Sequence, residues 1–430
     1  MAEDDVRGLG LTNWAGNLTY RAARLHEPRS LDELQEVVRG SPSLRVLGSR
    51  HSFSDVADTT GDLVSLGRLP RRFELDPVAR TLTIDGGVRY GDLCRPIDAA
   101  GFAFHNLASL PHISVAGACA TATHGSGDRN GNLATAVTAL EVVTADGETK
   151  RFARGVDDEF VGAVVGLGGL GVVTALTLAL EPTYRMRQDL YEDLPFGEAL
   201  EHFDELTASA DSVSLFTEWS GPLFEQVWFK RRVVDGAPFE PEPTMFSATR
   251  ATVPIHPIRR MLADVLTEQL GVPGPWYERL PHFRMDHTPS AGAELQSEYL
   301  FDRRHAADAI LAVERVRETF AHLVQVSEVR TVAADELWMS TAFGRPSVAL
   351  HFTWQPDWEG VRRVLPTIEE ALAPFDPCPH WGKLFTMPAE RVRASYERLE
   401  DFAALLQRYD PNRRFRNPFL GRYIFDEEED

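Results

Sequence analysis

One uncharged stretch constrains the fold more than any other part of the chain. Residues 161–180, VGAVVGLGGLGVVTALTLAL, carry no charged side chain, and the stretch has the length of a membrane-spanning helix. Its flanks, DDEF and EP, offer no basic anchor, and GLGGLG interrupts it in the middle. We therefore expect the end of a buried helix, a turn and a long buried strand that ends at Pro182, and no membrane span.

The turn at residues 166–171 matches the G-x-G-x-x-G pattern of dinucleotide-binding folds. That fingerprint follows a strand and opens a helix. Here the β-branched run VVTALTL follows it, so the context is inverted and we reject a Rossmann fold. Two interpretations remain: a plain structural turn, or a tight turn against something bulky.

A second stretch, residues 113–127 (ISVAGACATATHGSG), contains almost no large side chains. Small residues let backbone N–H groups approach a ligand closely, as a pyrophosphate requires. Four hydroxyl side chains add donors: Ser114, Thr121, Thr123 and Ser126. A close-packed crossing of backbone segments would have the same composition. The loop at residues 48–52 is of the same kind, and together with GLGGLG these segments suggest a long, phosphate-bearing cofactor threaded between them.

The pattern of predicted helices and strands changes near residue 183, and a length of 430 residues favours two lobes. Before that point short helices and strands alternate. SLDELQEVVRG, with the N-cap Ser30, predicts a helix, and AVTALEVVTADGETKRFA predicts a hairpin around Asp146-Gly147. After it, longer and more aromatic strands predict an α+β lobe built on an antiparallel sheet covered by helices.

The net charge of −20 excludes some classes of function. A nucleic-acid-binding protein needs a basic footprint, and a strongly anionic substrate is disfavoured. The three cysteines, Cys94, Cys119 and Cys378, show neither a disulfide framework nor metal-type spacing, so we expect no metal site. The acidic start lacks an apolar leader, which makes a cytoplasmic enzyme the default expectation.

Several motifs, taken in order, identify a family. LGSRHSFSD, NLASLPHISVAGACATATHGSG and GLGGLGVVTALTLALEP resemble the vanillyl-alcohol-oxidase-type flavoenzymes, which have a PCMH-type FAD domain. NWAGN near the start, and SEVRTVAAD, ALHFTW and HWGKLFT later, look like the alditol (xylitol) oxidases, relatives of the aldonolactone oxidases. The resemblance covers residues 13–419. It implies a two-lobed flavoenzyme with an FAD-binding domain at residues 1–183, a substrate-binding domain at 184–387, and a segment at 388–430 that returns to the FAD domain.

The resemblance also implies the cofactor and its contacts. In that family the histidine of the HSF motif is joined covalently to the flavin 8α carbon, and this residue is His51 here. A neutral imidazole is a reasonable nucleophile for that bond, which would raise the flavin potential. Arg50 stands where some relatives have glycine. The expected cofactor-binding residues besides His51 are Gly48, Ser49, Arg50, Ser52, Phe53, Ser109, Ser114, Gly117, Thr121, His124, Gly125, Ser126, Gly171 and Val172.

The second lobe carries paired polar residues on apolar strands. Because side chains alternate along a strand, Glu328 and Arg330 share one face, and so do His351 and Thr353. We expect Lys383 on a third such strand, HWGKLFT. Burying these charges is costly unless they are paired or used. A structural ion pair, a satisfied histidine and a solvated lysine are the alternative interpretations.

The family's substrate-binding residues fall on Ser109, Glu328, Arg330, His351, Thr353 and Lys383. The implied reaction transfers hydride from the terminal CH–OH of an alditol to flavin N5, and O₂ then yields H₂O₂. Arg330 and Lys383 would stabilise the developing alkoxide, and the others would bind the remaining hydroxyls. The proton acceptor stays open between His351 and a water molecule.

We expect a monomer with a polyol and O₂ as its small-molecule partners, and neither nucleic acid nor membrane. One alternative is an aldonolactone oxidase or dehydrogenase on the same fold. Alternatives of other classes are a sugar-binding protein without chemistry and a membrane-attached electron-transfer enzyme, which the lack of an anchor disfavours.

Overall fold

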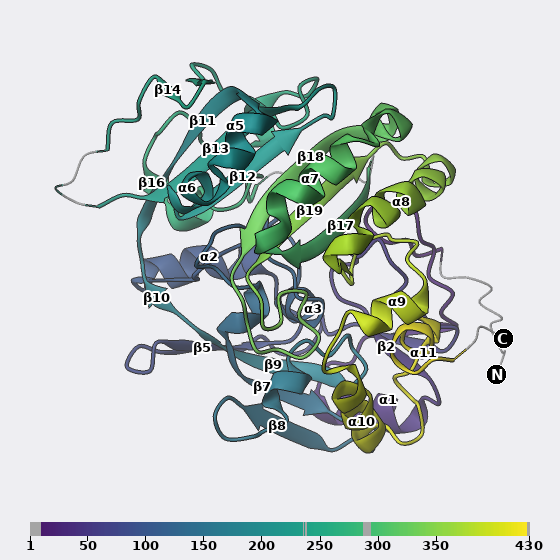
Figure 1. The fold of residues 1–430 in the computed structure, drawn as a ribbon. Coiled ribbons are helices and arrows are strands. Elements are labelled where there is room, and N and C mark those ends of the chain that lie inside the picture. The colour runs from purple at the N-terminus through teal and green to yellow at the C-terminus, as the bar shows by residue number, and fades with distance from the viewer. Residues whose placement is uncertain (1–9, 235, 237–238, 287–293, 428–430) are drawn as a thin grey trace.

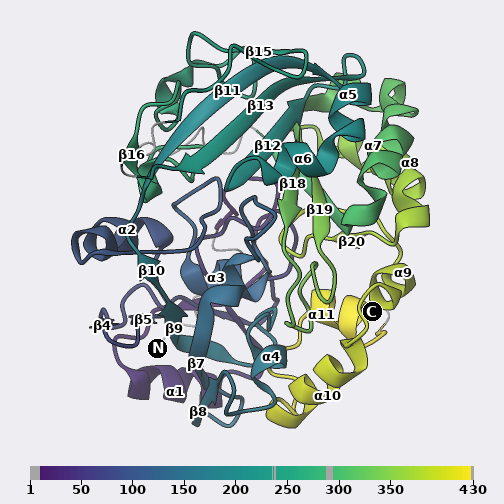
Figure 2. The same cartoon turned by 60° about the vertical axis from the view of Figure 1, so that its left-hand side comes forward.

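The computed structural model describes residues 10–234, 236, 239–286 and 294–427. Two lobes are visible in Figure 1: a large sheet with its helices above, and smaller sheets with the N-terminal helices below. Figure 2 shows the same division after a turn of the molecule. The fold is therefore α+β and two-lobed, as predicted.

The lower lobe is built on a five-stranded antiparallel sheet and a small parallel one. The larger sheet runs, in spatial order, β4 (Phe73–Asp76), β5 (Thr81–Asp85), β9 (Val172–Ala179), β7 (Val137–Val143) and β8 (Thr149–Ala153). The parallel sheet has the order β1 (Arg24–His26), β3 (Asp62–Val64) and β2 (Leu44–Val46). The helices of this lobe are α1 (Leu31–Gly40), α2 (Tyr90–Ala99), α3 (Val115–Ala120) and α4 (Phe160–Ala163).

Local signals account for several of these elements. The Ser30 hydroxyl accepts a hydrogen bond from the Glu33 N–H at 3.1 Å and caps α1 as predicted. The predicted hairpin is confirmed as β7 and β8, whose turn places Gly147 at φ +81°. The small-residue stretch differs from the expected loop, because residues 115–120 form the short helix α3. Its lack of large side chains lets this helix pack closely against neighbouring backbone.

The uncharged stretch at residues 161–180 divides as expected into the end of α4, a turn and β9. The strand itself ends at Ala179, and Glu181–Pro182 forms the separate β10, which pairs with β6 (Phe102–Ala103). In the part of the chain that the structure describes, no helix has both the length and the apolar character needed to cross a membrane.

The upper lobe is a ten-stranded sheet. Its main path runs β14 (Thr244–Met245), β15 (Ala248–Arg250), β11 (Arg185–Pro195), β13 (Leu223–Arg232), β12 (Ser212–Thr217), β18 (Val324–Val332), β19 (Ser347–Trp354), β17 (Leu295–Asp302) and β20 (Cys378–Pro379), while β16 (Gly274–Pro275) pairs with β11. One face is covered by α5 (Phe196–Glu201), α6 (Phe203–Ala208), α7 (Ala306–Glu314) and α8 (Trp358–Leu372) (Figures 1 and 2).

The segment HWGKLFT is not the third strand that the sequence predicts. It forms a turn after β20, in which the Lys383 N–H donates to the His380 carbonyl at 3.0 Å. The indole of Trp381 is fully buried and donates to the Met339 carbonyl at 2.9 Å. The turn stays at the edge of the sheet, because the Leu384 N–H donates to the Gln296 carbonyl of β17 at 2.9 Å, and this places Lys383 beside the sheet.

The last segment contains α9 (Ala389–Ala394), α10 (Leu399–Tyr409) and α11 (Pro418–Ile424) and lies against the lower lobe. The Leu44 N–H donates to the Arg414 carbonyl, and the Asn417 amide donates to the Asp58 carbonyl, both at 2.8 Å. Helix α10 lies close to α4 (Figure 2). These contacts support the predicted return of the C-terminal segment, while the exact domain boundaries stay a prediction.

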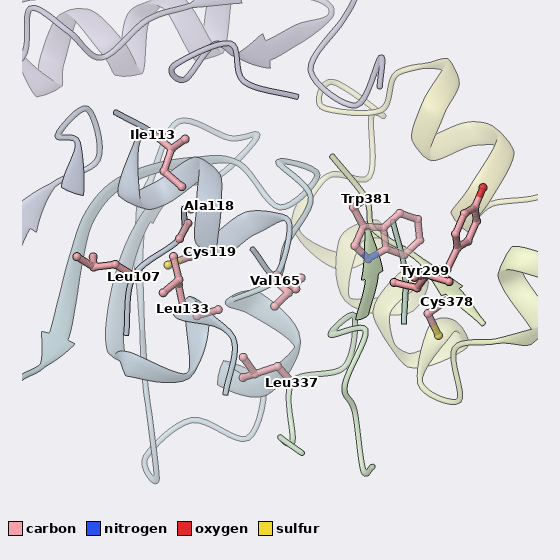
Figure 3. Packing of buried hydrophobic residues seen from close by; sticks show 14 of the residues in the cluster. Leu107, Ile113, Ala118, Cys119, Leu133, Val165, Tyr299, Leu337, Cys378 and Trp381 are labelled. Atoms are coloured by element: carbon pink, nitrogen blue, oxygen red, sulfur yellow. The ribbon is translucent and has the colours of Figure 1, made fainter. Parts of the chain in front are cut away.

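A single hydrophobic cluster spans both lobes. Figure 3 labels members of it in two groups, Leu107, Ile113, Ala118, Cys119 and Leu133 on one side, and Tyr299, Cys378 and Trp381 on the other. Because this packing is continuous, the walls of the space between the lobes are held by well-packed elements on both sides.

Candidate active site

A cavity of about 700 Å³ lies between the two lobes. Its walls combine the loop at residues 48–53, the start of α3 and the GLGGLG turn from the lower lobe with the inner face of the ten-stranded sheet. That volume is typical of a site for a cofactor or another small molecule.

Two small-residue segments cross at the edge of this cavity. The Ser114 N–H donates to the Ser49 hydroxyl at 3.0 Å. A Cβ atom placed on Gly48 or on Gly117 would lie 2.7 Å from the Ser114 hydroxyl oxygen. The segments therefore cross closely, and the residues at the crossing also line the cavity, while their contact with a cofactor stays a prediction.

His51 lies in the cavity wall on the loop between these segments. Its imidazole stacks on Trp14, with ring centroids 5.5 Å apart and planes inclined by 18°. Its Nδ1 atom is buried and has no hydrogen-bond partner. Burial, assisted by the cation of Arg89, lowers the pKa of His51 to about 4, so the ring is neutral at pH 7. An unpartnered neutral nitrogen beside a glycine-lined cradle fits FAD.

Arg50, next to His51, adopts φ +63°, the left-handed conformation that glycine adopts freely. Its carbonyl accepts the Trp14 N–H at 2.7 Å, and its guanidinium donates to the Thr12 carbonyl at 3.1 Å. These contacts hold the arginine in a conformation that costs a non-glycine residue about 1 kcal/mol. The cradle thus keeps its shape with arginine at this position.

The bulky group inside the GLGGLG turn is Arg45, from β2. Its guanidinium is buried and donates to the carbonyls of Leu167 at 2.6 Å, Gly168 at 2.9 Å and Phe415 at 2.8 Å. Gly171, at the end of the turn, lines the cavity at φ +145°, and a Cβ there would lie 2.4 Å from the Val143 carbonyl. The turn therefore closes on an arginine on one side and borders the cavity on the other.

Three predicted cofactor residues do not line the cavity. Gly125 packs against the Leu107 carbonyl, the hydroxyl of Ser126 donates to the Val213 carbonyl, and Val172 belongs to a separate hydrophobic cluster beside α1. All other predicted cofactor residues lie in its wall: His51, Gly48, Ser49, Arg50, Ser52, Phe53, Ser109, Ser114, Gly117, Thr121, His124 and Gly171.

The sheet brings the predicted polar residues together on its inner face. Glu328 and Arg330 on β18, His351 and Thr353 on β19, and Lys383 from the turn all line the cavity. Glu328 pairs with His351 across the two strands. The alternation predicted from the sequence therefore places both pairs on the same face of the sheet.

A buried carboxylate, Glu298 on β17, connects these residues. Its Oε2 lies 2.7 Å from the Lys383 ammonium, and its Oε1 lies 2.5 Å from the Arg330 guanidinium. The Lys383 Nζ also donates to His351 Nδ1 at 2.8 Å, and His351 Nε2 lies 3.1 Å from the Thr353 hydroxyl. Each of the charges therefore has a partner, as buried charges require.

Glu298, which is 1% exposed, is a site residue that was not predicted from the sequence. A signal was present in ELQSEYLF, because Glu294, Gln296 and Glu298 alternate along a predicted strand and therefore share a face. All three line the cavity. Histidines His282 and His380, which also lie in the wall, carried no such pattern.

The charges of the site follow from burial and from these pairs. Burial alone would raise the pKa of Glu298, but Lys383 and Arg330 hold it well below its usual range. The pKa of Arg330 is raised, because Glu328 and Glu298 outweigh the effect of its burial. Burial lowers the pKa of Lys383, and burial together with Lys383 holds the pKa of His351 well below its usual range. The site thus combines two carboxylates, a permanent guanidinium, an amine with a lowered pKa and a neutral imidazole.

Two family models match parts of the chain. The FAD binding domain model matches residues 22–153, and the D-arabinono-1,4-lactone oxidase model matches residues 293–423. The first range contains the His51 loop and α3, and the second contains the polar strands of the upper lobe. Both matches therefore fall on the two halves of the cavity wall.

Whole-chain relatives agree with these matches. An L-gulono-1,4-lactone dehydrogenase from Mycobacterium tuberculosis (strain CDC 1551 / Oshkosh) is 27% identical over 96% of this chain and 98% of its own. A crystal structure of cholesterol oxidase from B. sterolicum shares the fold, with a TM-score of 0.76 and 14% identity over 96% of each chain. An alditol oxidase from Streptomyces sp. (strain IKD472 / FERM P-14339) is 52% identical over 95% of this chain and 98% of its own. The chain therefore belongs to the alditol oxidase family of FAD-binding oxidoreductases.

Proposed function

We propose that this protein is an FAD-dependent oxidase that converts the terminal CH–OH of alditols such as xylitol and sorbitol to an aldose, with O₂ reduced to H₂O₂. The observation that carries the proposal is the cavity between the lobes, where Glu328, Arg330, His351 and Lys383 face the His51 loop. The 52% identity to an alditol oxidase supports the substrate class.

FAD, when bound, supplies the hydride acceptor and passes the electrons to O₂. His51 would attach it covalently, and the crossing of residues 48–53 with the start of α3 would hold its pyrophosphate through backbone N–H groups. The neutral, unpartnered nitrogen of His51 supports this assignment. Acid denaturation followed by peptide mapping tests it: flavin that stays on the peptide containing His51 supports the bond, and released flavin contradicts it.

Arg330 and Lys383 are the groups that we assign to the reacting hydroxyl. Both cations line the cavity and are held by the same carboxylate, Glu298, so their positions are fixed before the substrate binds. Preorganised cations in a dry site stabilise a developing alkoxide far better than solvated ones do. Glu328, Ser109, and the pair His351 and Thr353 would bind the other hydroxyls and orient the reacting carbon.

The network narrows the possible proton acceptors. A lysine ammonium has donors only, so His351 Nδ1 must accept from Lys383, and the ring proton then lies on Nε2 beside Thr353. Neither nitrogen of His351 is free to take a proton from the substrate directly. Since the Lys383 ammonium has no acceptor either, we infer that the hydroxyl proton leaves through water.

Stopped-flow reduction with xylitol and with an aldonolactone, each with and without O₂, tests the proposed activity. Fast reduction by xylitol and fast reoxidation by O₂ support the alditol oxidase, whereas selective reduction by the lactone would support the lactone enzyme. Lys383→Met should nearly abolish turnover while the flavin stays bound, and Lys150→Met, at an exposed position of β8, is the matched control. An unchanged kcat in Lys383→Met would contradict its role.

The proposal includes a monomer in the cytoplasm. A net charge of −20 favours a soluble, monomeric particle. The cysteines Cys94, Cys119 and Cys378 are all free and buried, which suits a reducing compartment. Light scattering after size exclusion and cell fractionation test the two statements.

A further inference from the structure

The chain contains only three lysines among its 44 lysines and arginines, and two of them, one buried and one 14% exposed, lie at or beside the site. Lys150 is exposed, and Lys383 belongs to the site described above. The third, Lys230 on β13, is 1% exposed, and the next two residues along the strand are arginines. In a chain whose cations are nearly all arginines, this fully buried cation is a lysine. An unpaired charge at a buried position is costly, so Lys230 needs a partner.

Lys230 is connected to the cavity through a histidine. Its Nζ donates to the Leu280 carbonyl at 2.5 Å and to His282 Nδ1 at 3.0 Å. The other ring nitrogen, His282 Nε2, lies 3.0 Å from Glu328 Oε1. Among the described residues no carboxylate lies within ion-pair distance of the Lys230 ammonium. The chain Lys230–His282–Glu328 is therefore the route by which this buried cation reaches a negative charge.

The geometry decides which atoms carry protons. An ammonium has no acceptor, so His282 Nδ1 must accept from Lys230, and the ring proton must lie on Nε2, where it is donated to Glu328. Burial and the nearby Lys230 lower the pKa of His282 to about 4, which keeps the ring neutral. Burial would raise the pKa of Glu328, but Arg330 and His282 hold it far below its usual range. Glu328 is thereby kept as an ionised group that can only accept hydrogen bonds.

The backbone of His282 contacts the lower-lobe wall of the cavity. The backbone N–H of His282 donates to the Ser109 carbonyl at 3.1 Å. His282 thus links β13 and β18 of the upper lobe to the FAD-side wall, and its own ring lies in the cavity lining. A change in the His282 ring would act directly on Glu328, and it would reach Arg330, 3.7 Å from the other Glu328 oxygen, only through Glu328.

We propose that Lys230 and His282 are positioning residues that fix Glu328 as a hydrogen-bond acceptor for an inner hydroxyl of the substrate, and so select polyols over alcohols that lack that hydroxyl. The inference rests on the proposed alditol oxidation. Glu328 contacts the substrate, while His282 acts through Glu328 and Lys230 acts through His282. Hydride transfer needs no proton from the series Lys230–His282–Glu328. The effect of these residues therefore appears in substrate recognition.

The test compares xylitol with pentane-1,5-diol, which has the same length without the inner hydroxyls. The diol is measured as a substrate or as a competitive inhibitor of xylitol oxidation. Lys230→Met and His282→Phe should raise KM for xylitol about tenfold or more, with a smaller change in kcat, and leave the constant for the diol unchanged, since charged hydrogen bonds of this kind are the stronger ones. His282→Gln, whose amide can accept from Lys230 and donate to Glu328, should restore most of the xylitol KM.

A double-mutant cycle with Glu328→Gln gives the second readout. If Lys230 acts through Glu328, then Lys230→Met adds little to the xylitol KM once Glu328 is glutamine. Additive effects, or equal losses for xylitol and the diol, overturn the proposal. The flavin content and the unfolding midpoint of each variant show whether a substitution has disturbed the whole fold. If Lys230→Met does not fold, the comparison of His282→Gln with His282→Phe tests the proposal in its place.

The pH dependence of the KM for xylitol is a further measurement, which a lysine with a purely structural role would not affect. Burial lowers the pKa of Lys230 to about 7, with Glu328 opposing the shift and Arg330 adding to it. The ammonium that fixes the His282 tautomer is therefore lost as the pH rises above that value. In the wild type, the KM for xylitol should increase as the pH rises above about 7. Lys230→Met should not show this increase. If wild-type protein does not oxidise xylitol at all, the proposed function fails before this inference is tested.

Discussion

Glu298→Gln is the substitution that most directly tests how the site is held together. The side chain is 1% exposed, and its two oxygens face the Lys383 ammonium at 2.7 Å and the Arg330 guanidinium at 2.5 Å. Glutamine has almost the same shape, so no cavity is created. The change removes one negative charge and turns an NH₂ donor toward one of the two cations.

The expected loss of stability follows from this geometry. Breaking a buried ion pair by removing one partner costs about 3–5 kcal/mol, because the remaining charge is left uncompensated. A typical domain has a free energy of unfolding of about 5–15 kcal/mol, so the loss is large enough to measure by urea unfolding at pH 7. The control is Glu336→Gln, whose partner Arg154 lies 2.8 Å away in a pair with side chains 64% and 35% exposed. That change should cost at most about 1 kcal/mol.

The same variant predicts a change of activity with pH. The pKa of Lys383 is already lowered by burial, and Glu298 is the first of the groups that oppose this shift. Without the carboxylate the pKa of Lys383 falls further, so less of the amine is charged at pH 7. The kcat/KM of Glu298→Gln for xylitol should therefore rise as the pH is lowered, relative to the wild type. Stability within about 1 kcal/mol of Glu336→Gln, together with an unchanged pH profile, would refute the reasoning.

Three further predictions concern the cradle and the cavity wall. Arg50→Gly relieves the φ of +63° and loses one surface hydrogen bond, so the free energy of unfolding should be unchanged or rise by up to about 1 kcal/mol, with covalent flavin retained; a loss above that size would contradict the account. Gly171→Ala places a Cβ 2.4 Å from the Val143 carbonyl at φ +145° and should reduce both stability and flavin content, whereas Gly155→Ala, with open space around its Cβ, should cost only about 1 kcal/mol for its positive φ. Burial lowers the pKa of His256 to about 4, below its unfolded value, so the unfolded state binds the extra proton and stability falls between pH 6.5 and 4. His256→Gln should therefore lose about 2 kcal/mol less than the wild type between pH 7 and 5 in urea unfolding, and equal losses would show that this histidine is not buried in neutral form.

Local pattern was sufficient where the physics is local. Side chains alternate along any strand, so the spacing of Glu328 and Arg330 placed them on one face without knowledge of the fold. The flanks and the interruption of residues 161–180 were sufficient to predict a helix end, a turn and a strand. The order of the glycine-rich motifs identified the family and, through it, twelve of the lower-lobe residues that line the cavity.

The tertiary structure alone decided which groups meet. Glu298 is separated from Arg330 by 32 positions and from Lys383 by 85, so no local spacing relates them. Arg45 fills the GLGGLG turn from 122 positions away, and Lys383 reaches the site from a turn where a strand was predicted. A strand pattern specifies the face on which a charge lies, but its partner depends on which strands become neighbours. The sequence therefore determined the lobes, the cofactor class and the polar face, while packing between distant segments determined the ion pairs that set the charges of the site.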